Sequence, residues 1–524
     1  MTLRVDPSRS IGRRTVFAGA SALLVPLPAV AQTVTREKVA AALPKLKEFA
    51  RQIVGKELVP GLSIAVVHRD EIVLLDAFGV REIGKAATVD VDTVFQLASV
   101  SKPLSATVVA SLVGDGKVAW DSRIRDIDPG FALQDELAAA NVTIRDLFAH
   151  RSGLPGHVGD DIEELGFTQG EILQRLRLAK PAYSFRNGYS YSNFGLTEGA
   201  VAAARFSGQS WEETCEEKLY KPLGMASTSS RYRDFMNQTN RAALHVRVDG
   251  RVDGKWASFT RRNADAQAPA GGASSNARDM AQWLRLLLAN GQHEGRQLIA
   301  KEALQQTHVP ASVRGVDPDT GAAAFYALGW NVDYREHGVE WSHAGAFSAG
   351  ARTLVHLIPG QQLAIVVLSN AFPTGVPEGI AKTFFDLVFV GSPARDWVAY
   401  ANEIFDAGYK EMMKPSLAYV TPPAAPAPAL PISAYMGEYR NDYIGDVKVT
   451  ESGGSLFLHV GPASRRFPLA HFNRDVFVYT PMAEAPKVRS GVSFLVGPDG
   501  KASEVTVEDL NEYGLGRLTR VGPN

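Results

Sequence analysis

The pattern of apolar and polar residues predicts a helix followed by a β-hairpin in the first part of the chain. The stretch 36–54, REKVAAALPKLKEFARQIV, repeats apolar residues at helical intervals, which is typical of an amphipathic helix. The stretch 61–79 contains two β-rich runs on either side of a polar turn at His68–Asp70. A second pair of strands is predicted over 351–370, around the turn Pro359–Gly360.

Helical periodicity dominates the middle of the chain, from Ser101 to about Asn290. Residues 280–291, MAQWLRLLLANG, are one example and end at a glycine, as helices often do. Strand pairs therefore bracket a mostly helical middle, which favours one α+β unit whose antiparallel sheet is assembled from both ends. We expect the helices to form a lobe against that sheet.

The last part of the chain predicts a second, smaller domain. The proline-rich stretch TPPAAPAPALP is typical of a semi-rigid linker. After it, short β-type runs recur between turn residues and predict a small antiparallel barrel or sandwich; these runs are DVKVTES, SLFLHVG, DVFVYT, VSFLVG and SEVTVED. The predicted boundaries are 1–31 for a signal peptide, 32–412 for the first domain, 413–431 for the linker and 432–524 for the barrel-like domain.

The N-terminal segment has the residue order of a secretory signal. The pair Arg13–Arg14 precedes a short apolar run, and the small residues Ala29 and Ala31 follow it. This order predicts export by the twin-arginine route, cleavage after Ala31, and a periplasmic or secreted protein. A membrane anchor is the alternative, but prolines at 26 and 28 interrupt the run and it is short for a span. We expect no stable membrane insertion of the mature chain.

Composition and charge narrow the classes of function. The chain has 524 residues, of which 45% are hydrophobic, and its 55 basic and 56 acidic residues give a net charge of −1. No basic tract is long enough to follow a phosphate backbone, which argues against nucleic acid as a partner. The single cysteine, Cys215, precludes an intramolecular disulfide. No cluster of His, Cys, Asp and Glu has metal-site spacing, so we predict neither metal nor cofactor.

A serine and a lysine three positions apart are the first candidates for chemistry. In LASVSKPLSA, residues 97–106, both Ser99 and Ser105 lie three positions from Lys102, whereas Ser101 does not. Proline is tolerated only in the first turn of a helix, so Pro103 places the helix start close to Ser99. Ser99 would then lie where free backbone N–H groups face a developing oxyanion. A serine needs a neighbour to accept its proton, and a buried lysine can do so if its pKa is lowered.

Two further short motifs supply partners. Tyr191 and Asn193 are two positions apart and would project to the same side of an extended or turn segment. His343-Ala344-Gly345 precedes the strands over 351–370, and Gly345 would allow a ligand close to the backbone. Neither motif is specific alone. The Tyr-x-Asn pattern also occurs at 439–441, and the His-x-Gly pattern also occurs at His157, His293 and His459.

Taken in order, these motifs resemble those of the penicillin-recognising serine hydrolases. The similarity is to the branch of class C β-lactamases, D-alanyl-D-alanine peptidases, D-aminopeptidases and related esterases, and covers roughly 36–390. Four longer stretches carry it as well: PGLSIAVVHRDEIVLLDAFG, TIRDLFAHRSGLP, YKPLGMASTS and PAGGASSNARDMAQWL. The resemblance implies a β-lactamase-like α+β fold, with the sheet flanked by helices. The region after the linker resembles the lipocalin-like barrel appendage of some relatives, which borders the active-site mouth or assembles subunits, so a homo-oligomer is one expectation.

The resemblance also implies roles for individual residues. Ser99 would be the acylated nucleophile, and Lys102 would accept its proton or tune Tyr191. Tyr191 would act as general base in acylation and return the proton to the leaving group. Asn193 would hold the substrate amide. The order of proton transfer between Lys102 and Tyr191 stays open, because two coupled groups titrate as a pair.

The third motif departs from the Lys-Thr-Gly of class C β-lactamases. The resemblance implies that His343 supplies positive or hydrogen-bonding character there, and that the N–H groups of Ser99 and Ala346 form the oxyanion hole. Ala344 has no hydroxyl for a substrate carboxylate, and His343 is only partly charged at neutral pH. This favours a peptide, amide or ester substrate over a lactam. A true class C-like β-lactamase and a silent penicillin-binding sensor are the alternatives.

Other classes of hydrolase are disfavoured. The chain has no Gly-x-Ser-x-Gly sequence, which argues against a nucleophile elbow. His150, in HRSG, is interpreted as a structural histidine that caps or orients a loop.

Overall fold

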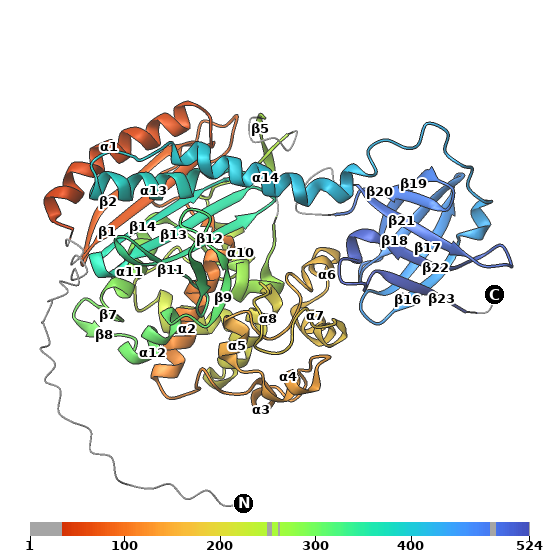
Figure 1. Ribbon diagram of the computed structural model, residues 1–524, viewed down its shortest axis with the longest axis horizontal. Helices are drawn as coiled ribbons and strands as arrows, with labels where there is room; N and C mark the ends of the chain where they lie inside the picture. The colour runs from red at the N-terminus through yellow and green to blue at the C-terminus, as the bar shows by residue number, and fades with distance from the viewer. Residues whose placement is uncertain (1–33, 249–253, 260–261, 483–488, 523–524) are drawn as a thin grey trace, which may run out of the picture.

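A computed structural model describes residues 34–248, 254–259, 262–482 and 489–522 (Figure 1). The predicted signal peptide, 1–31, lies outside the described residues. Within the described ranges, no helix combines the length and apolar character needed to span a bilayer.

The first domain is built on an eight-stranded antiparallel sheet with the strand order β2-β1-β14-β13-β12-β11-β10-β9. The sheet joins both ends of the domain, since Leu62 pairs with Ser369, as the apolar pattern predicted. The strands are β1 (Gly61–His68), β2 (Glu71–Gly79), β9 (Ser312–Val316), β10 (Ala323–Tyr326), β11 (Asn331–Arg335), β12 (Gly338–Phe347), β13 (Ala351–Ile358) and β14 (Leu363–Ser369).

Helices cover both faces of this sheet, which explains why every residue of β1 and β14 is buried. Alternate residues of β1 belong to different cores: Ile64 packs with α1 (Arg36–Gly55) and α13 (Val376–Phe389), whereas Ala65 lies in the core shared with α2 (Ser101–Gly114) and α11 (Ala277–Leu288). Successive side chains of a strand point to opposite faces, so a sheet covered twice needs apolar residues throughout. Figure 1 shows α1 and α13 together on one side of the sheet.

The predicted helical lobe lies on the other side and surrounds α2. Helix α2 is buried from Ser101 to Leu112, so its apolar residues are not confined to one stripe. The remaining helices of this side are α3 (Ile124–Ile127), α4 (Glu136–Asn141), α5 (Ile144–Phe148), α6 (Asp160–Leu165), α7 (Gln169–Arg175), α8 (Asn193–Ala204), α9 (Trp211–Cys215), α10 (Tyr232–Asn237) and α12 (Lys301–Gln305).

Short strands brace the loops around this lobe. One three-stranded sheet and two strand pairs form between segments that are distant in sequence or joined by tight turns. They are β15 (Ala371–Phe372) with β4 (Leu244–Arg247) and β5 (Trp256–Phe259), β3 (Phe95–Gln96) with β6 (Ser274–Ser275), and β7 (Gln292–His293) with β8 (Arg296–Gln297).

The second domain is a closed antiparallel barrel of eight strands in chain order. Its first and last strands pair, for example Tyr439 with Arg520, so the sheet has no free edge. The strands are β16 (Gly437–Asn441), β17 (Gly445–Ser452), β18 (Ser455–Val460), β19 (Arg465–Asn473), β20 (Val476–Tyr479), β21 (Ser490–Val496), β22 (Ala502–Val507) and β23 (Arg517–Val521). The structure therefore confirms the predicted barrel.

The connection between the domains differs from the predicted linker at its start. Helix α14 (Trp397–Leu417) continues through the expected boundary at 412, so residues 413–417 are helical. Pro415 lies in the last turn of this helix, which ends two residues later. Residues 421–431 contain no helix or strand, as expected of the proline-rich stretch. Figure 1 shows α14 running from the first domain towards the barrel.

Candidate active site

Ser99 lies on a tight turn that leads directly into α2. The turn is a short 3-10 helix, Ala98–Val100, and Ala98 before the serine adopts a left-handed backbone conformation with φ of 48°. Such a conformation is unfavourable for a residue with a Cβ and persists only where the surroundings hold it. Pro103 lies in the first turn of α2, so the structure confirms that the helix begins next to Ser99.

The three serines around Lys102 have different surroundings. Ser101 is buried and its Oγ accepts a hydrogen bond from the Ala273 N–H at 2.9 Å. Ser105 is also buried and donates to the Pro269 carbonyl at 2.6 Å. Ser99 is partly exposed. Two serines therefore hold the 269–273 segment in place, and Ser99 is the one that a substrate can reach.

Lys102 is completely buried, and three neutral oxygens lie within hydrogen-bond distance of its Nζ. They are Ser99 Oγ at 3.1 Å, Asn193 Oδ1 at 2.6 Å and the Ala270 carbonyl at 2.9 Å. The charged lysine donates to all three, whereas the neutral amine donates to two and can accept from the Ser99 hydroxyl. The Nζ also lies 4.5 Å from the centre of the Tyr191 ring. Burial lowers the pKa of Lys102 to about 7, and the negative charge of Asp160 opposes that fall. A substantial fraction of Lys102 is therefore neutral at physiological pH.

Tyr191 and Asn193 flank the start of α8. Ser192 caps this helix by accepting a hydrogen bond from the Gly195 N–H, which fixes Tyr191 just before the helix and Asn193 in its first turn. Burial raises the pKa of the Tyr191 phenol, and its interaction with the Ser99 hydroxyl opposes this rise. Asn193 uses both ends of its amide, because Oδ1 accepts from Lys102 and Nδ2 donates to Asp160 at 2.8 Å.

Gly345 lies on β12 against the Ser99 turn. A Cβ at this position would stand 2.1 Å from the Leu97 carbonyl oxygen, 2.4 Å from Thr353 Oγ1 and 3.1 Å from the Ser99 backbone nitrogen. The sequence predicted that a ligand would approach this glycine. The structure places the turn that carries Ser99 against this glycine, and Ala346 is the next residue on the strand.

His343 lies on β12, the strand just before the pair β13 and β14. Its Nδ1 lies 2.8 Å from the Ala344 carbonyl and its Nε2 lies 3.0 Å from the Tyr326 hydroxyl, so Nδ1 carries the proton and Nε2 accepts. Burial lowers the pKa of His343 to about 3. The expected partial positive charge is therefore absent, and the ring is a neutral hydrogen-bonding group.

His150 lies beneath the site. Its Nδ1 accepts a hydrogen bond from the Ser192 N–H at 3.2 Å, and its ring packs 4.6 Å from that of Tyr191. Burial holds the pKa of His150 well below its usual range. This neutral, buried ring orients the loop before α8, in agreement with the structural role expected from the sequence.

Four groups next to these residues were not predicted as part of the site. Tyr326 contacts His343 from β10, and the Ala270 carbonyl faces Lys102. Asp160, the first residue of α6, contacts Asn193, and His157 contacts Asp160. No short-range pattern identifies the contacts of Tyr326, Ala270 and Asp160 with the site, because each joins segments that are distant in sequence.

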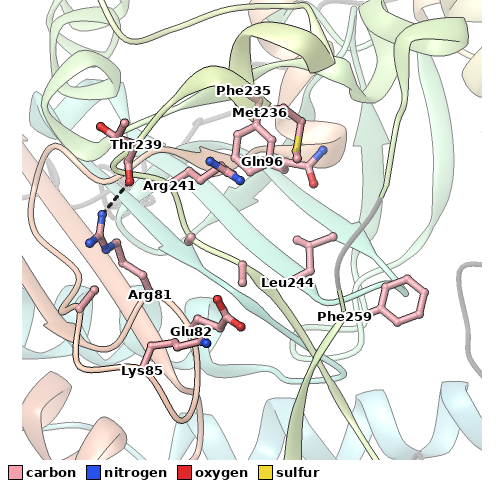
Figure 2. Close-up of a pocket in the computed structure, with 13 residues that line it drawn as sticks. Arg81, Glu82, Lys85, Gln96, Phe235, Met236, Thr239, Arg241, Leu244 and Phe259 are labelled. Carbon is pink, nitrogen blue, oxygen red and sulfur yellow. Dashed lines mark hydrogen bonds between the residues drawn. The ribbon is translucent and has the colours of Figure 1, made fainter.

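A separate cavity of about 590 Å³ is lined by residues close in sequence to the candidate site, but none of the site residues lines it (Figure 2). Gln96 lines it, together with Arg81, Lys85, Arg241 and Phe235. Figure 2 shows Arg81 bound to the Thr239 carbonyl. Ser99, Lys102 and Tyr191 are absent from its lining, so this cavity is separate from the candidate active site.

Comparison with known proteins agrees with this geometry. The family model described as Beta-lactamase matches residues 46–385. The chain belongs to the beta-lactamase family. It is a serine hydrolase with the β-lactamase-like fold that the sequence predicted. A second model, described as Domain of unknown function (DUF3471), matches residues 421–516, which include most of the barrel.

Several related proteins align with nearly the whole length of this chain. The Unguisins hydrolase ungD' of Aspergillus campestris is 26% identical over 494 residues, which cover 90% of this chain and 89% of the relative. An octameric penicillin-binding protein homologue from Pyrococcus abyssi has a TM-score of 0.56 at 19% identity, over 91% of this chain and all of that one. SurE has a TM-score of 0.58 at 19% identity, over 92% of this chain and all of its own, and was also solved with D-Leu. These two structures show the shared fold.

Proposed function

We propose that the protein is an exported hydrolase that cleaves peptide, amide or ester bonds through an acyl-enzyme on Ser99. One observation carries this proposal: a fully buried lysine with a pKa of about 7 lies 3.1 Å from the hydroxyl of the accessible serine. A serine is activated when a neighbouring group can accept its proton at the working pH. Neutral Lys102 meets this requirement.

The reaction runs in two halves. The Ser99 oxygen bonds to the substrate carbonyl carbon, and its proton passes to Lys102, while the N–H groups of Ser99 and Ala346 stabilise the oxyanion. The bond to the leaving group then breaks, and that group receives the proton through the Tyr191 hydroxyl. Water attacks the acyl-enzyme by the reverse proton path, which releases the acid and restores Ser99.

The opposite pKa shifts of the two groups support this order of transfer. Burial favours the neutral form of each, so Lys102 becomes a better acceptor near pH 7 whereas Tyr191 stays a phenol. A phenol that donates and accepts at once serves as a relay between serine, lysine and leaving group.

The third motif supports a peptide, amide or ester substrate. Neutral His343 and Ala344 offer neither a fixed cation nor a hydroxyl to a carboxylate, which disfavours the binding mode of a class C β-lactamase. The similar protein SurE was solved with D-Leu, and this supports an acyl group from a D-amino acid.

A turnover panel on the purified protein tests the proposal. The substrates are p-nitrophenyl acyl esters, D-amino-acid anilides, a peptide ending in D-Ala-D-Ala and a chromogenic cephalosporin, with Ser99→Ala as the blank. We expect fast esters or D-anilides and a slow cephalosporin. A fast cephalosporin would instead establish a β-lactamase, and silence with Ser99 still reactive would favour the sensor alternative.

Export and assembly complete the proposal. The basic, apolar and small residues of the first 31 positions support export to the periplasm or medium; protein isolated from expressing cells should begin at Gln32. The octameric homologue supports a homo-oligomer. Light scattering of the mature protein measures its size directly.

A further inference from the structure

Residues 156–161, here called the bridging segment, lie between the active site and the barrel. On the active-site side, Asp160 Oδ2 accepts a hydrogen bond from Asn193 Nδ2 at 2.8 Å and lies 3.0 Å from His157 Nδ1. His157 is exposed. Partial desolvation disfavours its charged imidazole, yet the hydrogen bond with Asp160 raises the pKa of His157. The segment thus brings an acidic group to the amide that contacts Lys102.

Asp160 determines how the Asn193 amide is oriented. An ionised carboxylate can only accept, so the Asn193 Nδ2 faces Asp160 and the amide oxygen is left for Lys102, whether the lysine is charged or neutral. Loss of the carboxylate removes this constraint, because the neutral lysine that the reaction uses can accept as well as donate. The Asp160 charge also keeps the pKa of Lys102 from falling further. Tyr191, His157, His150 and His343 are the other titratable groups near Lys102.

The barrel holds the bridging segment near both ends. The Tyr443 hydroxyl accepts from the Gly159 N–H at 3.1 Å and donates to Asp161 Oδ1 at 2.7 Å. The Tyr513 hydroxyl donates to the Gly156 carbonyl. Figure 1 shows α6, which begins in this segment, on the side of the lobe that faces the barrel. Two side chains of the barrel therefore bind the segment that carries Asp160.

The backbone of the bridging segment needs such support. His157 has φ of 62° and Gly159 has φ of 96°, so two of its six residues are in left-handed conformations. For a residue with a Cβ such as His157, this conformation costs about 1 kcal/mol or more and depends on its surroundings. Gly159 is also tightly packed, because a Cβ there would lie 2.8 Å from both Ile172 and Phe194.

We infer that Tyr443 and Tyr513 are positioning residues for hydrolysis: they hold the bridging segment so that Asp160 fixes the Asn193 amide against Lys102. This inference rests on the proposed function. It makes the barrel a working part of the active site, although neither tyrosine contacts the Ser99 group itself.

The test compares full-length Tyr443→Phe, Tyr513→Phe and double variants with the unmodified enzyme. Ester turnover is measured against pH, with kcat and KM separated. We expect the double variant to lose at least tenfold in kcat with a smaller change in KM. The midpoint of the pH profile should fall below that of the unmodified enzyme, because a displaced Asp160 no longer raises the pKa of Lys102.

Two further variants keep the inference falsifiable. Tyr439→Phe loses a hydroxyl that donates to the Tyr435 carbonyl inside the barrel, and it should leave turnover and midpoint unchanged. Asp160→Asn leaves the barrel contacts intact and should reproduce the downward shift. Wild-type kcat and midpoint in the double variant, or an unshifted midpoint in Asp160→Asn, would overturn the inference. Absence of turnover in the unmodified enzyme would refute the proposed function instead.

Discussion

At the scale of single residues, accessibility and hydrogen bonding separate three serines that look alike in the sequence. Ser101 and Ser105 bind the backbone of the 269–273 segment, and this segment supplies the Ala270 carbonyl to Lys102. Ser99 alone among them is partly exposed and bound to the lysine. The two buried serines thus hold the segment that contacts Lys102, the proposed proton acceptor of Ser99.

This difference predicts the labelling of the three serines by a fluorophosphonate. Ser99→Ala should abolish the label, whereas Ser101→Ala and Ser105→Ala should keep it. Ser101→Ala leaves the buried Ala273 N–H without its acceptor, so it should lower the free energy of unfolding by about 1–3 kcal/mol. Mass spectrometry of the labelled peptide and urea denaturation check both parts. A label that persists in Ser99→Ala would contradict the assignment.

At the scale of elements, the site depends on the close approach of β12 to the turn before α2. The two pack so closely at Gly345 that no side chain fits between them. Two of the three contacts, with the Leu97 carbonyl oxygen and the Ser99 nitrogen, are with backbone atoms, which cannot give way by changing a rotamer; the third is with the Thr353 hydroxyl. The strand therefore fixes the position of the Ser99 turn.

Gly345→Ala should consequently impair both stability and activity. Overpacking costs about 1–3 kcal/mol, and a displacement of about 1 Å at a nucleophile can reduce kcat/KM about 100-fold. Gly360→Ala is the matched control, since no atom lies within 4 Å of a Cβ there. Urea denaturation and ester turnover measure the two effects. Normal kcat/KM in Gly345→Ala would show that the turn adjusts freely.

Sequence patterns identify those elements whose periodicity is strong. The structure confirms the hairpin 61–79 and the strands over 351–370. Strands β1 and β14 are mostly apolar because both faces of the sheet are covered there. Strand β19, with two arginines and a proline, lacks this signal and was not predicted. Likewise, β9 has mostly exposed or half-exposed residues at the edge of the large sheet.

The same distinction applies to the site. Ser99 and Lys102 share a helical turn, so spacing alone relates them. Local motifs also identify Tyr191, Asn193 and His343. The contacts among these residues cannot be predicted from the motifs, because they form only when distant segments pack together. Tyr326 and Asp160 belong to no such motif, because their contacts with His343 and Asn193 depend on how the strands and the bridging segment pack.

At the scale of the whole molecule, the barrel docks on the helical lobe through polar groups that include an acid. Arg465 of the barrel donates to the Glu164 carbonyl, and Arg175 of the lobe donates to the Tyr443 carbonyl. Asp161 lies among them, and burial raises its pKa from 3.8 to about 7. The interface therefore favours a protonated Asp161.

This predicts a pH-dependent stability that Asp161→Asn removes. Between about pH 4 and 7 the folded state holds a proton on Asp161 that the unfolded chain releases, so stability falls as pH rises through this window. Asparagine can still accept from Tyr443 but does not ionise. At pH 4 or below the two proteins should be similarly stable, and at pH 8 the variant should be more stable by about 1–3 kcal/mol. The free energy of unfolding is measured by urea denaturation at each pH. The same difference between the two proteins at both pH values would contradict this prediction.

The pairing of β1 with β14 has a consequence for how the chain acquires its structure. Leu62 meets Ser369, so the large sheet has high contact order and cannot close until almost the whole first domain has been synthesised. In the barrel, each strand pairs with the next strand along the chain, and the one exception is the closure between β16 and β23. Folding should therefore be slow and non-local in the catalytic domain and faster in the barrel. The active site, completed by contacts from both, would be among the last features to form.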